Sequence, residues 1–182
     1  MELEMIGLGK MGANMTERLI KGGHRVVGFD LDPESVQRVI DVGVEGARSL
    51  EELVRKLSSP RVIWIMVPAG RPVDATIEAL LSHMSHDDVL IDGGNSNYKD
   101  TMRRAGECAA AGGHFVDVGT SGGIWGLTEG YSMMVGGDPD VVDRLGPLFE
   151  TLAPAADRGW VAPVRAEPAI TSRWCITASS TG

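Results

Sequence analysis

Short apolar runs alternate along the first 150 residues with stretches whose apolar positions recur every three or four residues. The short runs are rich in β-branched residues, which is typical of strands buried on both faces of a parallel sheet. They occupy residues 3–7, 25–30, 61–67, 89–92, 114–118 and 131–135. The periodic stretches predict helices at 12–22, 33–42, 101–111 and 139–152. Such alternation predicts an α/β fold with a doubly wound, mostly parallel sheet.

Two helix starts carry capping signals. Asp32 precedes the helix at 33–42 and is a plausible N-cap, with Gly43 as its stop. Ser49 is a plausible cap of a further helix, since Glu52 three residues later would complete a capping box.

A glycine-rich motif lies between the first predicted strand and the first predicted helix. It reads Gly7-Leu8-Gly9-Lys10-Met11-Gly12. The first glycine allows a tight turn, the second lets the backbone approach a pyrophosphate, and the third allows close helix–strand packing. The motif alone is weak evidence, but its position between strand and helix predicts a Rossmann-type cofactor site.

An acidic residue closes the second predicted strand. Asp30 stands 18 residues after Gly12, where a carboxylate accepts hydrogen bonds from the ribose hydroxyls of adenosine. The same carboxylate repels a 2′-phosphate, and no arginine follows it directly. We therefore expect NAD as cofactor, with NADP as the second possibility. The alternative is that Asp30 only forms a turn or caps a helix.

Three more polar or glycine-rich segments follow predicted strands, at the edge where open α/β sheets bind ligands. They are Met66-Val67-Pro68-Ala69-Gly70, Asp92-Gly93-Gly94-Asn95-Ser96 and the stretch 119–126, which reads G-T-S-G-G-I-W-G. Taken alone, Gly93 and Gly94 could form an ordinary turn, Asn95 could form an Asx-turn, and Ser121 could cap a helix.

Together with the glycine motif, these segments resemble the short-chain form of 6-phosphogluconate dehydrogenase, within the β-hydroxyacid dehydrogenase superfamily. The resemblance covers residues 1 to about 160. Its most specific part is T-S-G-G-I-W-G-L-T-E-G-Y at 120–131, because hydroxyisobutyrate-type relatives usually carry A-P-V-S-G-G there.

The resemblance implies a role for each segment. Val67, Pro68 and Ala69 would line the nicotinamide half of the cofactor. Asn95 would contact both the nicotinamide end and the substrate. The turn Ser121-Gly122-Gly123 would hold the substrate, 6-phosphogluconate, through its hydroxyl and backbone N–H groups. Trp64 and Trp125 are expected to be packing residues.

The family oxidises the substrate and decarboxylates it to ribulose 5-phosphate, a step of the pentose phosphate pathway. The resemblance implies a catalytic lysine and glutamate in a later segment, G-P-x-G-A-G-H-x-V-K-M-V-H-N-G-I-E-Y. This segment is absent from the sequence, as is the C-terminal helical domain that carries the family's homo-oligomer interface. We expect residues 1–160 to form the dinucleotide-binding domain, which would be inactive alone. Other possibilities are another β-hydroxyacid dehydrogenase and a non-catalytic nucleotide-binding module.

Residues 161–182 break the pattern, and we expect an aberrant, disordered tail there. A shifted reading frame accounts for it. New codons can be formed from the third base of one residue's codon and the first two bases of the next codon. In this shifted frame, residues 164–182 can read G-P-S-G-A-G-H-Y-V-K-M-V-H-N-G-I-E-Y-G. The pair Trp174-Cys175 must then give valine, since tryptophan has a single codon. We hypothesise a one-base frameshift between Trp160 and Val164.

Composition narrows the function classes. The net charge of −8 disfavours a nucleic-acid partner, which needs clustered Lys and Arg. The apolar runs fall short of the roughly 20 residues that cross a membrane, and the two cysteines have no metal-type spacing. We expect a cytoplasmic protein without a metal site.

The frameshift hypothesis predicts a result at the nucleotide level. In the DNA between the codons for Gly159 and Gly182, a single-base insertion or deletion should restore the family segment. The missing lysine should then span the codons of Ser172 and Arg173. Sequencing the gene checks this, and a gene in which no single-base change restores the segment contradicts it.

Overall fold

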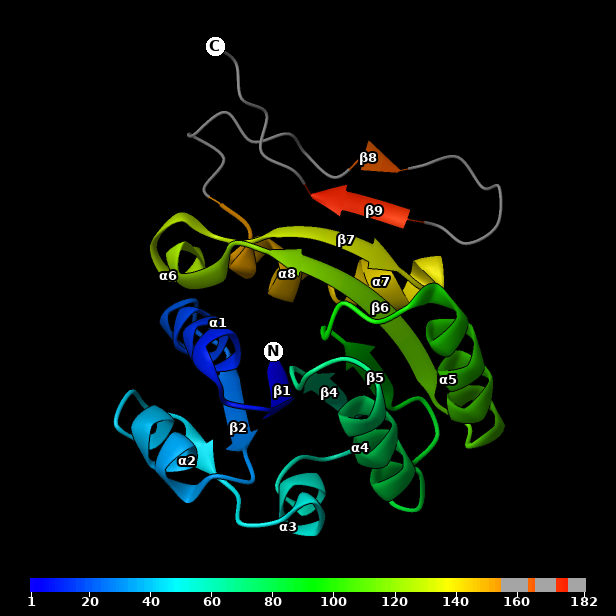
Figure 1. Cartoon of the computed structure of the whole chain (residues 1–182), viewed down its shortest axis with the longest axis horizontal. Coiled ribbons are helices and arrows are strands. Elements are labelled where there is room, and N and C mark those ends of the chain that lie inside the picture. Colours follow the sequence, from blue (N-terminus) through cyan, green and yellow to red (C-terminus); the bar gives the residue numbers. More distant parts are fainter. Residues whose placement is uncertain (155–163, 166–172, 177–182) are drawn as a thin grey trace.

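The computed structural model describes residues 1–154, 164–165 and 173–176. One sheet runs through it in the order β3-β2-β1-β4-β5-β6-β7-β9-β8 (Figure 1). Its strands are β1 (Glu2–Ile6), β2 (Arg25–Phe29), β3 (Glu45–Gly46), β4 (Val62–Ile65), β5 (Val89–Asp92), β6 (His114–Ser121), β7 (Ser132–Gly136), β8 (Val164–Arg165) and β9 (Arg173–Ile176). Strands β1 to β6 pair in parallel, whereas β7, β8 and β9 pair antiparallel. The predicted doubly wound, mostly parallel sheet is confirmed.

The order of the strands reverses at β1. This strand pairs with β2 on one side, where Met5 lies opposite Gly28, and with β4 on the other, where Met5 lies opposite Trp64. The chain builds outward from β1 in one direction and then from β4 in the other. A crevice outside the carboxyl ends of β1 and β4 is therefore the expected ligand site of this topology.

Helices cover both faces of the sheet (Figure 1). They are α1 (Lys10–Lys21), α2 (Pro33–Ile40), α3 (Leu50–Arg55), α4 (Arg71–Leu81), α5 (Tyr98–Ala110), α6 (Gly126–Glu129), α7 (Pro139–Arg144) and α8 (Gly146–Leu152), with a 3₁₀ helix at Gly123–Trp125. Residues of α1, α2, α7 and α8 share one hydrophobic core, and residues of α3, α4 and α5 share another. The strands contribute to both cores, which explains why their sequences are continuous apolar runs.

The predicted capping residues are confirmed. The Asp32 carboxylate accepts hydrogen bonds from the backbone N–H groups of Glu34 and Ser35, at the start of α2. The Ser49 hydroxyl accepts one from Glu52 N–H at 3.1 Å. The Glu52 carboxylate reaches back to Arg48 N–H rather than to the cap residue itself.

Several predicted boundaries are wrong. The helix predicted at 139–152 is two helices, because Pro147 cannot donate a backbone hydrogen bond and the chain bends at Leu145–Gly146. The helix predicted at 101–111 begins earlier, at Tyr98, where the Asn97 side chain caps it. Helix α4 and the short strand β3 were not predicted.

The predicted disordered tail falls mostly outside the described residues. The structure describes only β8 and β9 there, with β9 paired to β7 and β8 to β9. The boundary at residue 160 and the disorder beyond it stay predictions. In the described part of the chain, no helix is long and apolar enough to cross a membrane.

A buried acid interrupts the apolar pattern of β1. The Glu4 side chain is 0% exposed, and neither carboxyl oxygen has a hydrogen-bond partner among the described residues. Burial raises the pKa of Glu4 to about 8; the Arg61 charge opposes this rise, and the Asp88 charge adds to it. Arg61 and Asp88 are themselves tightly paired, with Arg61 Nε 3.0 Å from the Asp88 carboxylate. The folded protein therefore holds Glu4 in its neutral form at neutral pH.

This burial predicts a pH-dependent stability. Because the folded pKa of Glu4 (about 8) lies above its ordinary value of 4.5, the folded state keeps a proton that the unfolded state releases. The full contribution is present below pH 4.5 and is lost as the pH rises toward 8, by up to ~1.4 kcal/mol per pH unit. Urea unfolding of Glu4→Gln should lack this pH-dependent loss.

Glu2→Gln is the matched control, since Glu2 lies on the same strand with its side chain 56% exposed. It should keep the pH dependence of the parent protein. Identical pH profiles for Glu4→Gln and the parent would contradict the assignment to Glu4.

Candidate functional site

A cleft of about 540 Å³ opens at the carboxyl ends of β1, β2 and β4, on the crevice that the topology predicts. Its lining comes from segments far apart in the sequence. The lining residues are Ile6, Gly7, Gly9, Phe29, Asp30, Leu31, Leu50, Met66, Val67, Pro68, Pro72, Ala75 and Thr76. The structure thus brings Gly7, Gly9, Asp30, Val67 and Pro68, all predicted from the sequence, to one cavity.

Two glycines of the motif are required by the fold itself. Gly7 has φ +92°, and a Cβ there would lie 2.6 Å from the Met66 carbonyl oxygen. A Cβ at Gly12 would overlap the Gly7 carbonyl oxygen. The absence of a side chain at Gly7 and Gly12 therefore lets α1 lie close against the end of β1, as the packing role of the third glycine requires.

Gly9 differs from the other two glycines. It is exposed, its φ is −62°, and a Cβ there would meet no described atom within 4 Å. The residue that follows begins α1, whose first turn reads Lys10-Met11-Gly12 without a carboxylate. First-turn N–H groups of a helix have no carbonyl partner within the helix. The open space at Gly9 and the positive end of α1 therefore fit a pyrophosphate.

Leu8, Lys10 and Met11 occupy different environments in the same loop. The Leu8 side chain is buried in the core beside Gly28. Lys10 is exposed at the first position of α1, and Met11 packs partly against the core. Of the three, only Lys10 presents its side chain to solvent at the helix start.

Asp30 connects the glycine loop to the next segment. One carboxylate oxygen accepts the Leu8 N–H at 2.6 Å, and the other accepts the Asp32 N–H at 2.9 Å. The second contact is a local turn, as the alternative interpretation of Asp30 expected. Asp30 also lines the cleft. Each carboxylate oxygen keeps a lone pair beyond its one backbone contact, which leaves room for a sugar hydroxyl.

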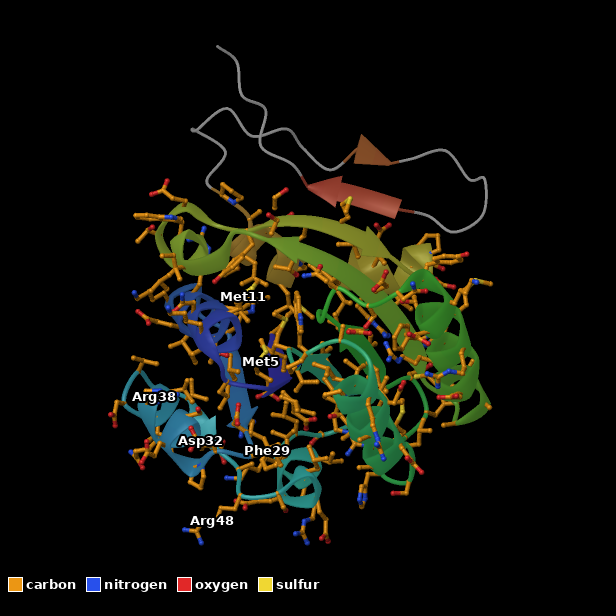
Figure 2. All side chains as sticks on the ribbon, viewed as in Figure 1. Met5, Met11, Phe29, Asp32, Arg38 and Arg48 are labelled. Carbon is orange, nitrogen blue, oxygen red and sulfur yellow. The ribbon has the colours of Figure 1, made fainter. Side chains whose placement is uncertain are left out.

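A second pocket of about 730 Å³ shares Phe29, Asp30 and Leu31 with the cleft. Two cations line it, Arg48 and Lys56. Lys56 is paired with Glu45 at 3.0 Å and with Glu52 at 3.3 Å. Arg48 is exposed and extends outward (Figure 2).

Two carboxylates, Asp30 and Asp32, lie in the turn that follows β2, and Asp30 lines this pocket. Hydrogen bonds from Ser35 and the Glu34 backbone hold the pKa of Asp32 below its ordinary value. Asp30 lies two residues before it. This pair of carboxylates is unfavourable for a phosphate at the adenosine 2′ position. The cations of this region are Arg48 and Lys56, which line the pocket, and Arg38, whose charge helps to lower the pKa of Asp32.

The predicted nicotinamide segment follows β4. Val67 is half-buried and Pro68 is exposed, and both line the cleft. Ala69 is exposed outside that lining, and Gly70, with φ +89°, caps the start of α4. The segment therefore borders the cleft through two of its three predicted residues.

The predicted substrate residues lie together beside this segment. Asn95 has φ +57°. Its side chain pairs twice with the backbone of Thr120, accepting from the Thr120 N–H at 3.0 Å and donating to the Thr120 carbonyl at 3.3 Å. Thr120 directly precedes Ser121, at the end of β6. The Asn95 side chain thus holds the predicted substrate turn at the end of β6, whereas the local side-chain turn of this loop is made by Asp92, which accepts from the Gly94 N–H at 2.9 Å.

The turn after Thr120 consists largely of glycine and packs against the ring of Tyr131. Gly122 and Gly123 have φ +150° and +50°, and the Tyr131 ring lies against Gly122 and Gly126. Tyr131 is fully buried.

Trp64 is also fully buried and packs edge-on against Phe149, as expected. The packing prediction for Trp125 is wrong, because this side chain lies on the surface 3₁₀ helix and is 70% exposed.

Sequence reasoning missed the apolar part of the cleft. Leu31, Leu50, Pro72, Ala75 and Thr76 come from α3, α4 and the loop after β2. Leu31 offered one signal in the sequence, as an apolar residue between Asp30 and Asp32, and the structure leaves its side chain 91% exposed. The others depend on how α3 and α4 pack. Among the described residues, no group of three His, Cys, Asp or Glu side chains could hold a metal ion.

Residues 2–162 match the family described as the NAD binding domain of 6-phosphogluconate dehydrogenase. A relative from Haloferax volcanii, the NAD(+)-dependent, decarboxylating 6-phosphogluconate dehydrogenase, is 46% identical over 157 residues, which is 86% of this chain and 52% of the relative. The NADP(+)-dependent, decarboxylating enzyme of Bacillus subtilis is 39% identical over 160 residues, covering 86% of this chain and 34% of the relative. The chain thus spans about one third to one half of these relatives.

Solved structures give the same picture. The 3-hydroxyisobutyrate dehydrogenase of Mycobacterium tuberculosis superposes with a TM-score of 0.78 at 29% identity, over 84% of this chain and 52% of that one. The 6-phosphogluconate dehydrogenase of Plasmodium falciparum superposes with a TM-score of 0.77 at 28% identity, over 85% and 34%. The glycine loop, the cleft and the match over residues 2–162 together establish that this chain belongs to the family of NAD-binding domains of 6-phosphogluconate dehydrogenase.

Proposed function

We propose that the chain is the cofactor-binding part of an oxidoreductase that converts 6-phosphogluconate to ribulose 5-phosphate with NAD. One observation carries this proposal. The cleft at the carboxyl ends of β1, β2 and β4 joins the glycine loop, Asp30 and the segment after β4, and the Asn95–Thr120 pair lies at the neighbouring strand ends. Bound nicotinamide would supply the hydride acceptor, and the residues of this chain would bind and orient it.

In the proposed arrangement the pyrophosphate lies at Gly9, on the N–H groups that begin α1. The adenosine ribose lies at Asp30, whose oxygens already order the loops on either side. Val67, Pro68 and Ala69 border the nicotinamide. Gly70, the N-cap of α4, follows them with φ +89°. Leu8, Lys10, Met11 and Gly12 contribute backbone and packing to the same loop.

The substrate would lie against Asn95 and the turn Ser121-Gly122-Gly123. Asn95, Gly122 and Gly123 have positive φ values, and the two glycines carry no side chain that would cover their N–H groups, which suits an anionic sugar acid. The catalytic lysine and glutamate implied by the resemblance belong to the shifted reading frame. The 182-residue chain would therefore bind the cofactor without turnover.

We infer NAD rather than NADP from the two carboxylates at Asp30 and Asp32. The curated relatives include an NAD(+)-dependent and an NADP(+)-dependent enzyme, so the family alone does not decide. A cytoplasmic location is a further part of this proposal, and so is a homo-oligomer of the frame-restored protein, formed through the family's helical domain.

A hydroxyisobutyrate-type dehydrogenase is the second candidate. The structural similarity to the Mycobacterium tuberculosis 3-hydroxyisobutyrate dehydrogenase favours it. The sequence I-W-G that follows Gly123 favours the sugar-acid enzyme instead. The two candidates share the cofactor site and differ in the acid that they oxidise.

Two glycines of the motif, Gly9 and Gly12, give a test of cofactor binding and its control. Gly9→Ala meets open space, so its Tm should stay close to that of the parent, while its affinity for NAD falls roughly ten- to a hundredfold through lost phosphate contacts. Calorimetric titration with NAD and thermal unfolding measure the two effects.

Gly12→Ala is the matched control, since its methyl group would overlap the Gly7 carbonyl oxygen. It should lower the free energy of unfolding by about 1–3 kcal/mol. An unchanged NAD affinity in Gly9→Ala would exclude the pyrophosphate from this loop.

The substrate is tested on a protein whose reading frame has been restored. Its steady-state turnover should be fastest with 6-phosphogluconate and NAD, slower with NADP, and far slower with 3-hydroxyisobutyrate. The unaltered 182-residue chain should show no turnover. Preference for 3-hydroxyisobutyrate would favour the second candidate, and turnover by the unaltered chain would refute the assigned place of the lysine and glutamate.

A further inference from the structure

Arg104 lies on α5 with its side chain 0% exposed. Arginine is almost never fully buried unless its charge is paired, since desolvating a guanidinium is costly. The sequence does not distinguish Arg104 from the adjacent Arg103, whose side chain is exposed on the same helix. Arg104 is also absent from the lining of both pockets.

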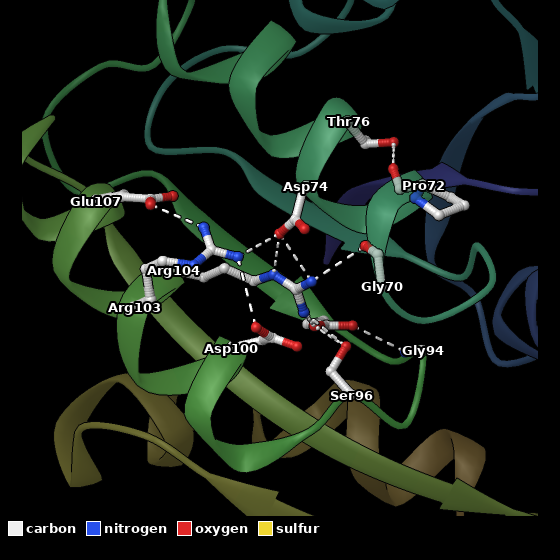
Figure 3. Close-up of polar contacts among 11 residues, drawn as sticks. Gly70, Pro72, Asp74, Thr76, Gly94, Ser96, Asp100, Arg103, Arg104 and Glu107 are labelled. Atoms are coloured by element: carbon white, nitrogen blue, oxygen red, sulfur yellow. Dashed lines mark hydrogen bonds and ion pairs between the residues drawn. The ribbon is translucent and has the colours of Figure 1, made fainter.

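The guanidinium of Arg104 contacts three other segments of the chain (Figure 3). Nε donates to the Asp74 carboxylate of α4 at 2.8 Å. One terminal nitrogen donates to Asp92 at 3.0 Å and to the Ser96 hydroxyl at 2.7 Å. The other lies 2.8 Å from Asp74 and donates to the Gly70 carbonyl at 3.2 Å.

Three of these acceptors, Gly70, Asp92 and Ser96, lie at the ends of two loops of the candidate site, those after β4 and β5. Gly70 is the last residue of the segment 67–70, which borders the proposed nicotinamide position. Asp92 and Ser96 flank Gly93, Gly94 and Asn95. Asp92 itself accepts from Gly94 N–H at 2.9 Å and from the Ser96 hydroxyl at 2.7 Å. One planar cation therefore holds the loop after β4 to the loop after β5.

The loop after β5 is in turn hydrogen-bonded to the end of β6. Asn95, one residue before Ser96, pairs twice with the Thr120 backbone. Thr120 leads into Ser121-Gly122-Gly123. A chain of direct hydrogen bonds and short backbone steps thus runs from Gly70 through Arg104 and Asn95 to the proposed substrate turn.

We propose that Arg104 is a positioning residue, which fixes the nicotinamide segment 67–70 relative to Asn95 and the substrate turn without touching either ligand. The inference rests on the proposed cofactor function. The fork of a guanidinium suits this task, because its five N–H donors have fixed directions and can satisfy acceptors on several segments at once. A lysine ammonium would reach fewer of them.

Arg103 provides a natural contrast. It shares Asp74 at 2.6 Å and pairs with Glu107 at 2.8 Å, but its described contacts include neither Gly70, Asp92 nor Ser96. Its removal keeps the buried network and changes only surface ion pairs, which contribute little to stability.

The test compares NADH with ADP-ribose, which shares the adenosine and pyrophosphate but lacks the nicotinamide. In Arg104→Met, calorimetry on the 182-residue chain should show roughly tenfold weaker NADH binding, with ADP-ribose affinity within about twofold of the parent. The NADH affinity of Arg104→Lys should lie between that of Arg104→Met and that of the parent. Arg103→Met should match the parent for both ligands.

Thermal unfolding accompanies each titration to compare the stability of the variants, and Ser96→Ala supplies a milder probe. This substitution removes the hydroxyl that bridges Arg104 and Asp92 without leaving an unpaired buried charge. It should weaken the binding of NADH more than the binding of ADP-ribose. This variant decides the question where Arg104→Met does not fold.

Equal losses for NADH and ADP-ribose in the folded variants would show a general structural role and overturn the inference. So would an unchanged NADH affinity, or a parent chain that binds NADH no more tightly than ADP-ribose. A parent chain that binds neither ligand would instead overturn the proposed cofactor function.

Discussion

The pairing of β1 with β2 on one side and β4 on the other is the constraint on which the remaining structure depends. Met5 lies opposite both Gly28 and Trp64, so three strands end side by side at one edge of the sheet. The loop after β1 leads to α1 and the loop after β4 leads to α4, and these two helices pack into different cores. The cleft forms where these two loops part toward opposite faces of the sheet.

Two polar contacts then convert this edge into an ordered site. On one side Asp30 binds the Leu8 N–H and fixes the glycine loop. On the other side Arg104 binds Gly70, Asp92 and Ser96 and fixes the loops after β4 and β5. Both contacts join segments distant in sequence. The pair of Arg104 with Asp92 is a buried ion pair, and such pairs contribute little net stability, so its clearest effect here is on the geometry of the loops.

The sequence predicted the cofactor half of the site more fully than the rest. Gly7, Gly9 and Asp30 could be assigned because their roles follow from local chemistry: a turn, an open helix start and a strand end. Leu50 and Thr76 could not, because they reach the cleft only through the packing of α3 and α4. Trp125 shows the same limit, since nothing in the pattern distinguishes an exposed tryptophan from a packed one.

The sequence by itself determined the alternation of strands and helices, the glycine loop, the acidic residue that follows β2 and the family. Each of these depends on neighbours within a few residues, or on motifs whose spacing is fixed along the chain. The tertiary structure alone decided the burial of Glu4 and Arg104 and the pairing of Asn95 with Thr120. These depend on which strands become neighbours, and a side chain's partners 25 or 30 residues away are set by that packing rather than by local sequence.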